Sequence, residues 1–235
     1  MRKVIIIACS ILLLATTVFS QKDKETKIEG SGNVITKDVT IQPFDQLEAN
    51  GVFNVVLTQG NKESLKIEAE DNLQALFEIK NEGSKLMVDM KKDSHFNSKK
   101  KMTVYITFKN LKSMDLKMVG NVSSEGNLNF SDLSLANKSV GSVDLALNAQ
   151  KLDINNKGVG NLRLSGKAEN AIIRSNSVGA IKASDLLVQT MDIDNDGVGS
   201  AEVNAVKELK VKDSFLWKVK NAGSATAKRI NKVVI

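Results

Sequence analysis

Apolar and polar residues alternate with a period of two along most of the chain after residue 50, a pattern typical of β-strands. The alternation is clearest around a Val-Gly dipeptide that returns at 119–120, 140–141, 159–160, 178–179 and 198–199, with a weaker copy in Ala222-Gly223. Successive glycines are 21, 19, 19, 20 and 24 residues apart. A repeat of near-constant length predicts a solenoid, whose coils bury their apolar sides against one another.

Numbering each repeat from its glycine tests this prediction. The residues eight and six positions before the glycine are apolar, as are those two and four positions after it, with Ser124 the exception: Leu133, Leu152, Ala171, Met191 and Phe215; Leu135, Ile154, Ile173, Ile193 and Trp217; Val122, Val143, Leu162, Ile181, Ala201 and Ala225; Leu145, Leu164, Ala183, Val203 and Ala227. Most residues between them are Ser, Asp, Asn, Arg or Lys. Each repeat is therefore predicted to hold two short strands joined at a glycine turn, in coils stacked about 4.8 Å apart. This predicts a parallel β-helix, with either two or three faces.

Glycine and asparagine mark the corners of the predicted coils. Glycine suits a turn that needs a positive φ or a close backbone approach, and we assign this role to Gly51, Gly120, Gly141, Gly160, Gly179, Gly199 and Gly223. Asn137, Asn156 and Asn195 stand four residues before their glycines, with Asn176 offset by one. Stacked asparagines can pair their side-chain amides from coil to coil.

The first half is also predicted to be β, with a less regular repeat. After Asn50-Gly51, Phe53, Val55 and Leu57 take the positions two, four and six after a glycine. Further strands are expected at 65–69, 86–90 and 102–108, with a helical turn at 71–77 capped by Asp71. These longer strands are expected to cap and start the solenoid, so we place no domain boundary and treat 28–235 as a single domain.

The N-terminus has the pattern of an export signal. Met1-Arg2-Lys3 is basic, residues 4–19 are apolar, and Val18 and Ser20 supply small or medium side chains at −3 and −1 of a cut after Ser20. We predict a signal peptide at 1–20 and a flexible tether at 21–27, hence a periplasmic, cell-surface or extracellular protein. An uncleaved anchor and a lipid-modified Cys9 are the alternatives. Cleavage leaves a chain without cysteine, so no disulfide stabilises it.

Several segments in order resemble one family: Gly30-Ser31-Gly32-Asn33 through Phe44, LEANGVFNVVLTQG at 47–60, LKIEAEDNLQ at 65–74, and the serial Val-Gly coils. Together they resemble the head GIN domain family, secreted bacterial proteins labelled auto-transporter adhesins and common among Bacteroidetes-type bacteria. The resemblance covers about residues 28–230. It implies a right-handed β-helix-like fold, export and no established catalytic activity.

Composition narrows the possible functions. Of 235 residues, 42% are hydrophobic and 26% charged, as in a globular protein rather than a disordered one. Loss of Arg2 and Lys3 with the signal lowers the formal net charge from +6 to +4, and the basic residues are dispersed, so we expect no nucleic-acid partner. One His and one Cys exclude most metal sites and Cys–His nucleophiles, and we expect no cofactor.

One acidic motif is a weak calcium candidate. Asp192, Asp194, Asp196 and Gly197 match positions 1, 3, 5 and 6 of a calcium loop, but Val203 stands where the bidentate Glu belongs. In an earlier aligned repeat, at residues 153–158, Lys157 replaces the third carboxylate. The other interpretation, which we favour, is the polar outer face and corner of one coil.

Carbohydrate chemistry must be weighed, because some parallel β-helices are pectinolytic. The outward carboxylates Asp144, Asp153, Asp192, Asp194 and Glu202 form no convergent ladder, since Arg163 and Lys182 intervene. Phe215 and Trp217 fall on inward positions, and Tyr105 stands alone as an exposed platform. His95 and Lys99-Lys100-Lys101 lie in an expected exposed loop and are interpreted as solvated, with contact to anionic head groups as the alternative for the lysines.

The sequence therefore predicts a secreted, non-catalytic β-solenoid whose polar faces bind an extended ligand such as a glycan or surface polymer. A self-associating envelope protein and, less favoured, a polysaccharide lyase or hydrolase remain as alternatives.

Overall fold

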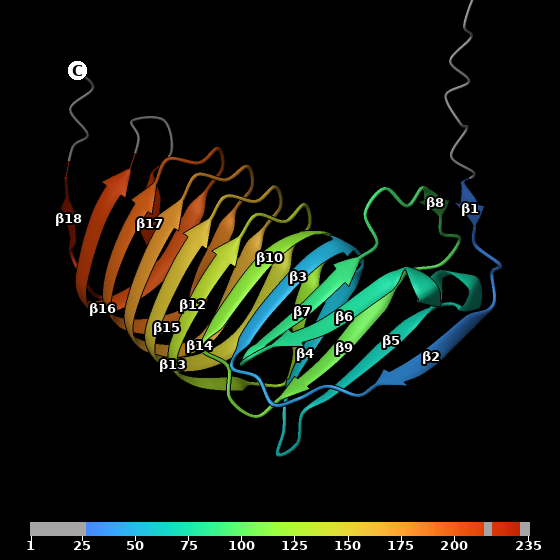
Figure 1. Ribbon diagram of the computed structural model, residues 1–235. Coiled ribbons are helices and arrows are strands. Elements are labelled where there is room, and N and C mark those ends of the chain that lie inside the picture. Colours follow the sequence, from blue (N-terminus) through green and yellow to red (C-terminus); the bar gives the residue numbers. More distant parts are fainter. Residues whose placement is uncertain (1–26, 214–217, 231–235) are drawn as a thin grey trace, which may run out of the picture.

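Parallel strands dominate the structure, a computed structural model that describes residues 27–213 and 218–230. The regular coils are made by β13 (Val143–Asn156), β14 (Leu162–Ser175), β15 (Ile181–Asn195) and β16 (Ala201–Asp213), each paired in parallel with the next. Figure 1 shows these strands stacked along the molecule, with their connecting loops aligned along one edge. The predicted β-solenoid and its repeat of about twenty residues are confirmed.

Each coil has two strand-lined faces. In β13, buried and exposed residues alternate except at Gln150 and Lys151, which are both exposed. The strand bends at this step. On the side of the preceding coil, β11 (Val122–Glu125) pairs with its first residues, and β12 (Leu128–Asn137) pairs with residues on both sides of the bend. The two short strands expected in a repeat are thus one continuous bent strand, and the Val-Gly corner closes the coil.

The predicted inward positions form the core. Leu133, Leu135, Leu145 and Leu152 are at most 2% exposed, and the equivalent residues of later coils are buried as well. Removing this apolar surface from water is the main force that holds the coils together, at about 25 cal/mol per Å².

The first half builds coils out of chain order. The strand β3 (Gln46–Val52) lies between β7 (Lys85–Met90) and β10 (Ser113–Val119), and all three are parallel. On the other face, β4 (Asn54–Gln59) lies between β9 (Thr103–Phe108) and β11. The chain thus makes the β3–β4 coil, adds the β7–β9 coil on its outer side, and crosses back to begin β10.

Antiparallel strands cover the outer end. On one face β2 (Val34–Val39) pairs with β5 (Ser64–Glu70), which pairs with β9, and on the other β6 (Phe77–Glu82) pairs with β7. The strands expected at 65–69, 86–90 and 102–108 are confirmed. The exposed loop expected around His95 contains a two-residue strand, β8 (Phe96–Asn97), paired with β1 (Ile28–Glu29).

The expected helical turn is a 3₁₀ helix, η1 (Asp71–Leu76), but the assignment of Asp71 as its cap is wrong. The capping position is Glu70, which makes no side-chain capping bond. The Asp71 carboxylate instead accepts hydrogen bonds from Ser31 and Asn33, so it ties the N-terminal segment to the helix.

The last coil departs from the predicted register. Val219, in β17 (Val219–Asn221), pairs with Ala201, and Ala227, in β18 (Ala227–Arg229), pairs with Leu209. Ala227 stands four residues after Gly223 in the sequence, but in the structure it pairs with Leu209 and not with Val203, the residue four positions after Gly199. Some predictions fall on residues outside the described ranges: the inward positions of Phe215 and Trp217, the signal peptide at 1–20, and residues 21–26 of the tether. Over the described ranges, no helix has the length and apolar composition needed to cross a bilayer.

A candidate binding groove at the open corner

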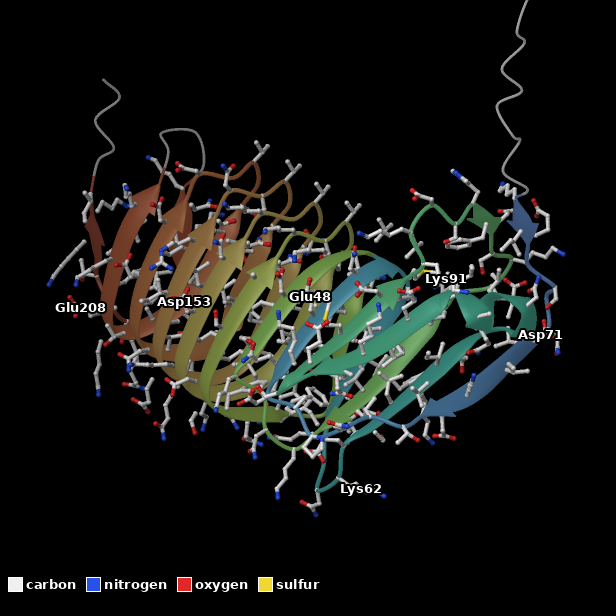
Figure 2. All side chains as sticks on the ribbon, viewed as in Figure 1. Glu48, Lys62, Asp71, Lys91, Asp153 and Glu208 are labelled. Carbon is white, nitrogen blue, oxygen red and sulfur yellow. The ribbon has the colours of Figure 1, made fainter. Side chains whose placement is uncertain are left out.

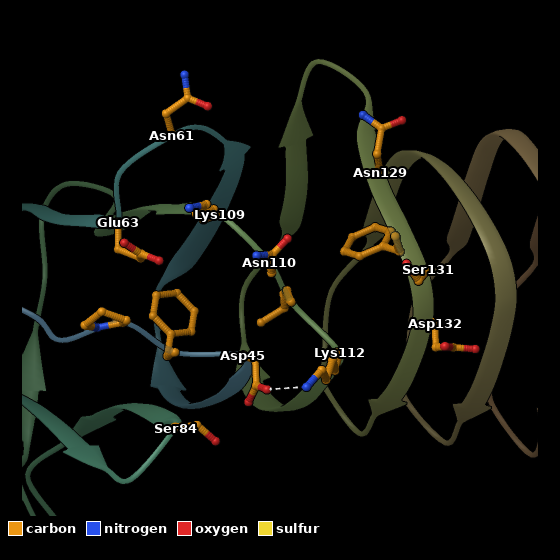
Figure 3. Close-up of a pocket in the computed structure, with 14 residues that line it drawn as sticks. Asp45, Asn61, Glu63, Ser84, Lys109, Asn110, Lys112, Asn129, Ser131 and Asp132 are labelled. Atoms are coloured by element: carbon orange, nitrogen blue, oxygen red, sulfur yellow. Dashed lines mark ion pairs between the residues drawn. The ribbon is translucent and has the colours of Figure 1, made fainter.

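A hollow lies where the two halves of the solenoid meet, at the corner opposite the Val-Gly loops. In the later coils one bent strand passes continuously through this corner. In the first half, by contrast, separate strands end there, because the chain leaves one face after Gln59 and Phe108 and enters the other face before Gln46 and Ser113. The corner therefore stays open (Figure 3). We call this cavity of about 740 Å³ the corner groove; it is lined by Pro43, Phe44, Asp45, Asn61, Glu63, Ser84, Lys109, Asn110, Leu111, Lys112, Asn129, Phe130, Ser131 and Asp132.

The floor of the corner groove is apolar and firmly held. Phe44, Leu111 and Phe130 are at most 7% exposed and belong to the core. The Phe130 ring stacks on Phe108, with ring centroids 5.9 Å apart and an angle of 16° between the planes. These residues close the ends of the two sheets, so the groove cannot deepen without opening the core.

Gln59 holds opposite walls of the groove together. Its Nε2 donates to the carbonyl oxygens of Lys109, at 3.2 Å, and Asn129, at 3.0 Å. Its Oε1 accepts the backbone N–H of Asn129 at 2.8 Å. Asn129 is thereby fixed at the rim, where its exposed side chain joins those of Asn61, Asn110 and Ser131.

An ion pair lies in the lining of the groove, between the residues that precede β3 and β10. Lys112 Nζ lies 2.8 Å from Asp45 Oδ2, as the dashed line in Figure 3 marks. Hydrogen bonds from Lys112 and then from Ser84 hold the pKa of the Asp45 carboxyl below its ordinary value, and Asp45 raises the pKa of Lys112 in turn. A general acid of a glycosidase needs a raised pKa, so Asp45 is poorly suited to donate a proton. Amides, hydroxyls and fixed charges around an apolar floor suit hydrogen-bonded recognition instead.

Five of the seven predicted turn glycines form a row at the Val-Gly corners. Gly120, Gly141, Gly160, Gly179 and Gly199 have φ between +134° and +149°. A Cβ at any of them would lie 2.0–2.2 Å from a carbonyl oxygen of the preceding coil. No side chain fits that space, which explains why these corners require glycine.

Gly51 and Gly223, the other two predicted turn glycines, lie outside this row. Gly51 pairs with Met118 rather than Gly120, and Val55, not Phe53, pairs with Val122. Residues 52–54 widen the first corner, so the Phe53 carbonyl takes the place that a glycine carbonyl has in later coils. Gly51 still has φ +142°. Gly223 lies against the Ala205 carbonyl, away from the row, because the last coil has a different register.

The predicted asparagine ladder lies inside the solenoid. Asn137 and Asn156 are paired by their side-chain amides, and Asn195 is buried two coils beyond Asn156. The third coil differs from the prediction, since Ser175, not Asn176, stands in this column and Asn176 is exposed. Asn156 Nδ2 also donates to the hydroxyl of Ser177 at 3.0 Å, so two serines replace the missing amide.

The calcium candidate does not form a closed loop. Asp192 and Asp194 lie within β15, which stays extended to Asn195, and the Asn195 side chain is buried between Asp194 and Asp196. Asp194 Oδ2 lies 3.4 Å from Lys212 Nζ in the next coil. In the described part of the chain, no three His, Cys, Asp or Glu residues are grouped as metal ligands.

The other candidates are dispersed. The outward column runs from Asp144 through Arg163 and Lys182 to Glu202, so basic residues do separate the acids. Figure 2 shows Asp153 and Glu208 on the outer face of the coils, far from Asp71 at the opposite end. Tyr105 is half-buried, whereas His95, Lys99, Lys100 and Lys101 are exposed near β8.

Sequence analysis missed a buried carboxylate. Glu70 has no exposed surface and accepts hydrogen bonds from the Ser98 hydroxyl, at 2.7 Å, and from the N–H groups of Gly32, at 2.6 Å, and Lys99, at 2.9 Å. The Ser98 bond, followed by the backbone bonds, lowers the pKa of Glu70. The sequence signal is Gly30, where any Cβ would collide with this carboxylate.

Comparisons with known proteins agree with this fold. The family model described as "Putative auto-transporter adhesin, head GIN domain" matches residues 43–225. A solved structure of a putative adhesin from Bacteroides fragilis NCTC 9343 is 31% identical, with a TM-score of 0.74, and the match covers 86% of this chain and 100% of that one. A putative lipid binding protein from Parabacteroides distasonis ATCC 8503 is similar in fold, at 17% identity and TM-score 0.61, with coverage of 87% and 100%. A putative adhesin from Parabacteroides merdae ATCC 43184 has 21% identity and TM-score 0.54, with coverage of 87% and 99%. The comparison with curated proteins gives no match.

Proposed function

Since the chain belongs to the head GIN domain family of auto-transporter adhesins, we propose that it is an exported, non-catalytic adhesin that binds an extended glycan, with one sugar unit seated in the corner groove. The observation that carries this proposal is the corner groove itself, with its apolar floor and its rim of amide and hydroxyl side chains. Its volume of about 740 Å³ falls in the range of small-molecule sites, about 300–1,000 Å³.

The chemistry of the lining favours a sugar. A sugar ring has an apolar face, which suits the floor of Phe44, Leu111 and Phe130, and hydroxyls around its edge. Asn110, Asn129 and Ser131 offer donors and acceptors to such hydroxyls from two walls that Gln59 holds in place. The polymer would continue along the outward polar rows of the coils, where an extended solenoid face offers repeated contacts.

The test is a glycan-array and polysaccharide pull-down screen with the purified protein, with and without calcium. We expect a saturable hit that the double variant Asn110→Ala, Ser131→Ala weakens at least about tenfold, because two hydrogen-bonding groups are lost. Asn176→Ala is the matched control, an exposed asparagine at a corner away from the groove. A blank screen, or a hit that both variants retain, overturns the proposed site. Shortening of the bound polymer overturns the non-catalytic assignment.

A self-associating envelope protein is the second candidate, favoured by the edge strand β2. Among the strands that the structure describes, β2 pairs only with β5, and it exposes Val34 and Ile35 at 40% and 41%. An open strand edge can add a strand from another copy. Light scattering over a range of concentrations decides, because a strictly monomeric protein contradicts this candidate.

A further inference from the structure

Six valines form an exposed ridge along the Val-Gly corners, which we call the valine ridge: Val52, Val119, Val140, Val159, Val178 and Val198. Each is 46–53% exposed. Consecutive members are paired, Val52 with Val119 in the β3–β10 ladder and the others by single parallel bridges. At a strand spacing of about 4.8 Å the ridge is about 24 Å long.

The side chains of the valine ridge are not part of the hydrophobic core. The buried neighbours of Val140 and Val159 point inward, while the valine side chains point to solvent beside glycines that bring the backbones together. Isolated exposed valines need no explanation, but a continuous row of them is the kind of apolar feature that marks an interaction surface.

The flanks of the ridge are basic on one side and uncharged on the other. The residues two positions before the valines are Asn50, Lys117, Lys138, Lys157, Asn176 and Asp196. Those two positions after the last five valines are Asn, Ser, Asn, Ala and Ser. Lys117 pairs with Glu48 and Asp115, whereas Lys138 and Lys157 form no ion pair within the described residues and are exposed. The middle of the ridge thus carries unneutralised positive charge.

The strand β1, near the start of the described chain, lies on the same side of the molecule as the valine ridge. In Figure 1 the row of corner loops runs along the upper edge, and β1 lies at that edge too. In the sequence, β1 begins nine residues after the apolar stretch of residues 4–19.

We propose that the valine ridge docks on an anionic lipid bilayer, with Val140, Val159 and Val178 entering the interface and Lys138 and Lys157 contacting the head groups. Apolar insertion combined with basic flanking residues is the established way for a surface to bind anionic membranes. A second copy of the chain suits the ridge less well. A ridge one residue wide buries little of the roughly 1,000 Å² that a stable protein interface needs.

Vesicle binding tests the proposal with the full chain. We expect binding to phosphatidylcholine–phosphatidylglycerol vesicles that Val140→Thr, Val159→Thr, Val178→Thr weakens about tenfold, because threonine keeps the β-branched shape but not the apolar surface. Lys138→Gln, Lys157→Gln should weaken it more than about fivefold on these vesicles and leave binding to pure phosphatidylcholine unchanged. The control Ile172→Thr, Leu187→Thr removes two exposed apolar residues outside the ridge and should have no effect.

A local probe separates the ridge from any contribution of the apolar N-terminal stretch. In a Cys9→Ser chain, a nitroxide at Val159→Cys should become more accessible to oxygen than to a water-soluble relaxant once vesicles are added, whereas one at Ile172→Cys should not change. A label at 159 that stays in water overturns the proposal. Spin–spin broadening at 159 without vesicles also overturns it, because a second copy then covers the ridge.

Discussion

The side-chain amide of Asn137 donates to Oδ1 of Asn156 in the next coil at 2.8 Å, and both side chains are at most 4% exposed. Asn137 Oδ1 is also occupied, since it accepts the N–H and the hydroxyl of Ser139. A buried polar group is tolerated only when it is hydrogen-bonded, so this pair ties two coils together through the interior.

Replacing Asn156 with leucine should therefore destabilise the protein strongly. The change leaves the Asn137 amide without its partner, at about 1–3 kcal/mol for an unsatisfied buried group, and removes one of the two partners of the Ser177 hydroxyl, which keeps its bond to Ser175. Urea unfolding followed by circular dichroism measures the loss. Asn176→Leu, at an exposed position one coil away, should stay within about 0.5 kcal/mol of wild type. Equal effects of the two changes contradict a role for the ladder in stability.

Gly160→Ala should be among the most damaging single substitutions in the chain. Its Cβ would lie 2.2 Å from the Gly141 carbonyl oxygen, so two coils must separate, and we expect a loss above about 4 kcal/mol. Gly83→Ala provides the control, because Gly83 also has a positive φ, +58°, but no atom within 4 Å of the added carbon. That variant should lose only about 1–2 kcal/mol. If Gly160→Ala yields no folded protein while Gly83→Ala does, the prediction holds; similar stabilities contradict it.

Calcium should not stabilise the protein. Asp194 faces Lys212 in the next coil, and the backbone from Asp192 to Asn195 is extended strand instead of a loop folded around an ion, so the carboxylates do not converge on one ion. We expect the same Tm in calcium and in chelator by calorimetry. A rise of Tm with calcium that Asp194→Asn, Asp196→Asn abolishes would restore the calcium site.

The regular coils could be predicted because each repeat places its apolar residues at the same offsets from a glycine. The predicted strand register is wrong at two places where the spacing from the glycine changes. Phe53 lies in a widened first corner, so Val55 pairs with Val122. After Gly199, Val219 rather than Ala225 pairs with Ala201. The corner groove could not be predicted, since it depends on the chain crossing back from β9 to β10 past the β3–β4 coil. Alternation does place each corner valine outward, but only stacking shows that the six form one ridge.

Acid should release the N-terminal segment from the end of the solenoid. Glu70 lies buried between Gly30–Gly32 and Ser98–Lys100, and its carboxylate is held by N–H and O–H donors that a neutral acid binds less well. These bonds, the Ser98 bond above all, lower the pKa of Glu70 in the folded state from 4.5. The resulting stabilisation is present above the unfolded pKa and is lost as the pH falls from about 4.5 through the folded pKa.

Hydrogen exchange at single amides measures this loss where it occurs. In the wild type, the protection factors of the Gly32 and Lys99 amides should fall between pH 5 and pH 3, before those of core amides such as Leu145 and Ile154, because those two residues are buried within β13 among apolar side chains. Glu70→Gln should lower the protection of Gly32 and Lys99 already at pH 7 and remove most of its pH dependence, since glutamine has the same shape but no charge. Glu82→Gln, on an exposed residue of β6, should leave both amides as in wild type.

Asp71 tethers the same segment, and hydrogen bonds from Ser31 and then Asn33 lower the pKa of Asp71 as well. A residual acid response in Glu70→Gln should therefore vanish when Asp71→Asn is added. Protection of Gly32 that is constant from pH 7 to pH 3 contradicts the role of Glu70.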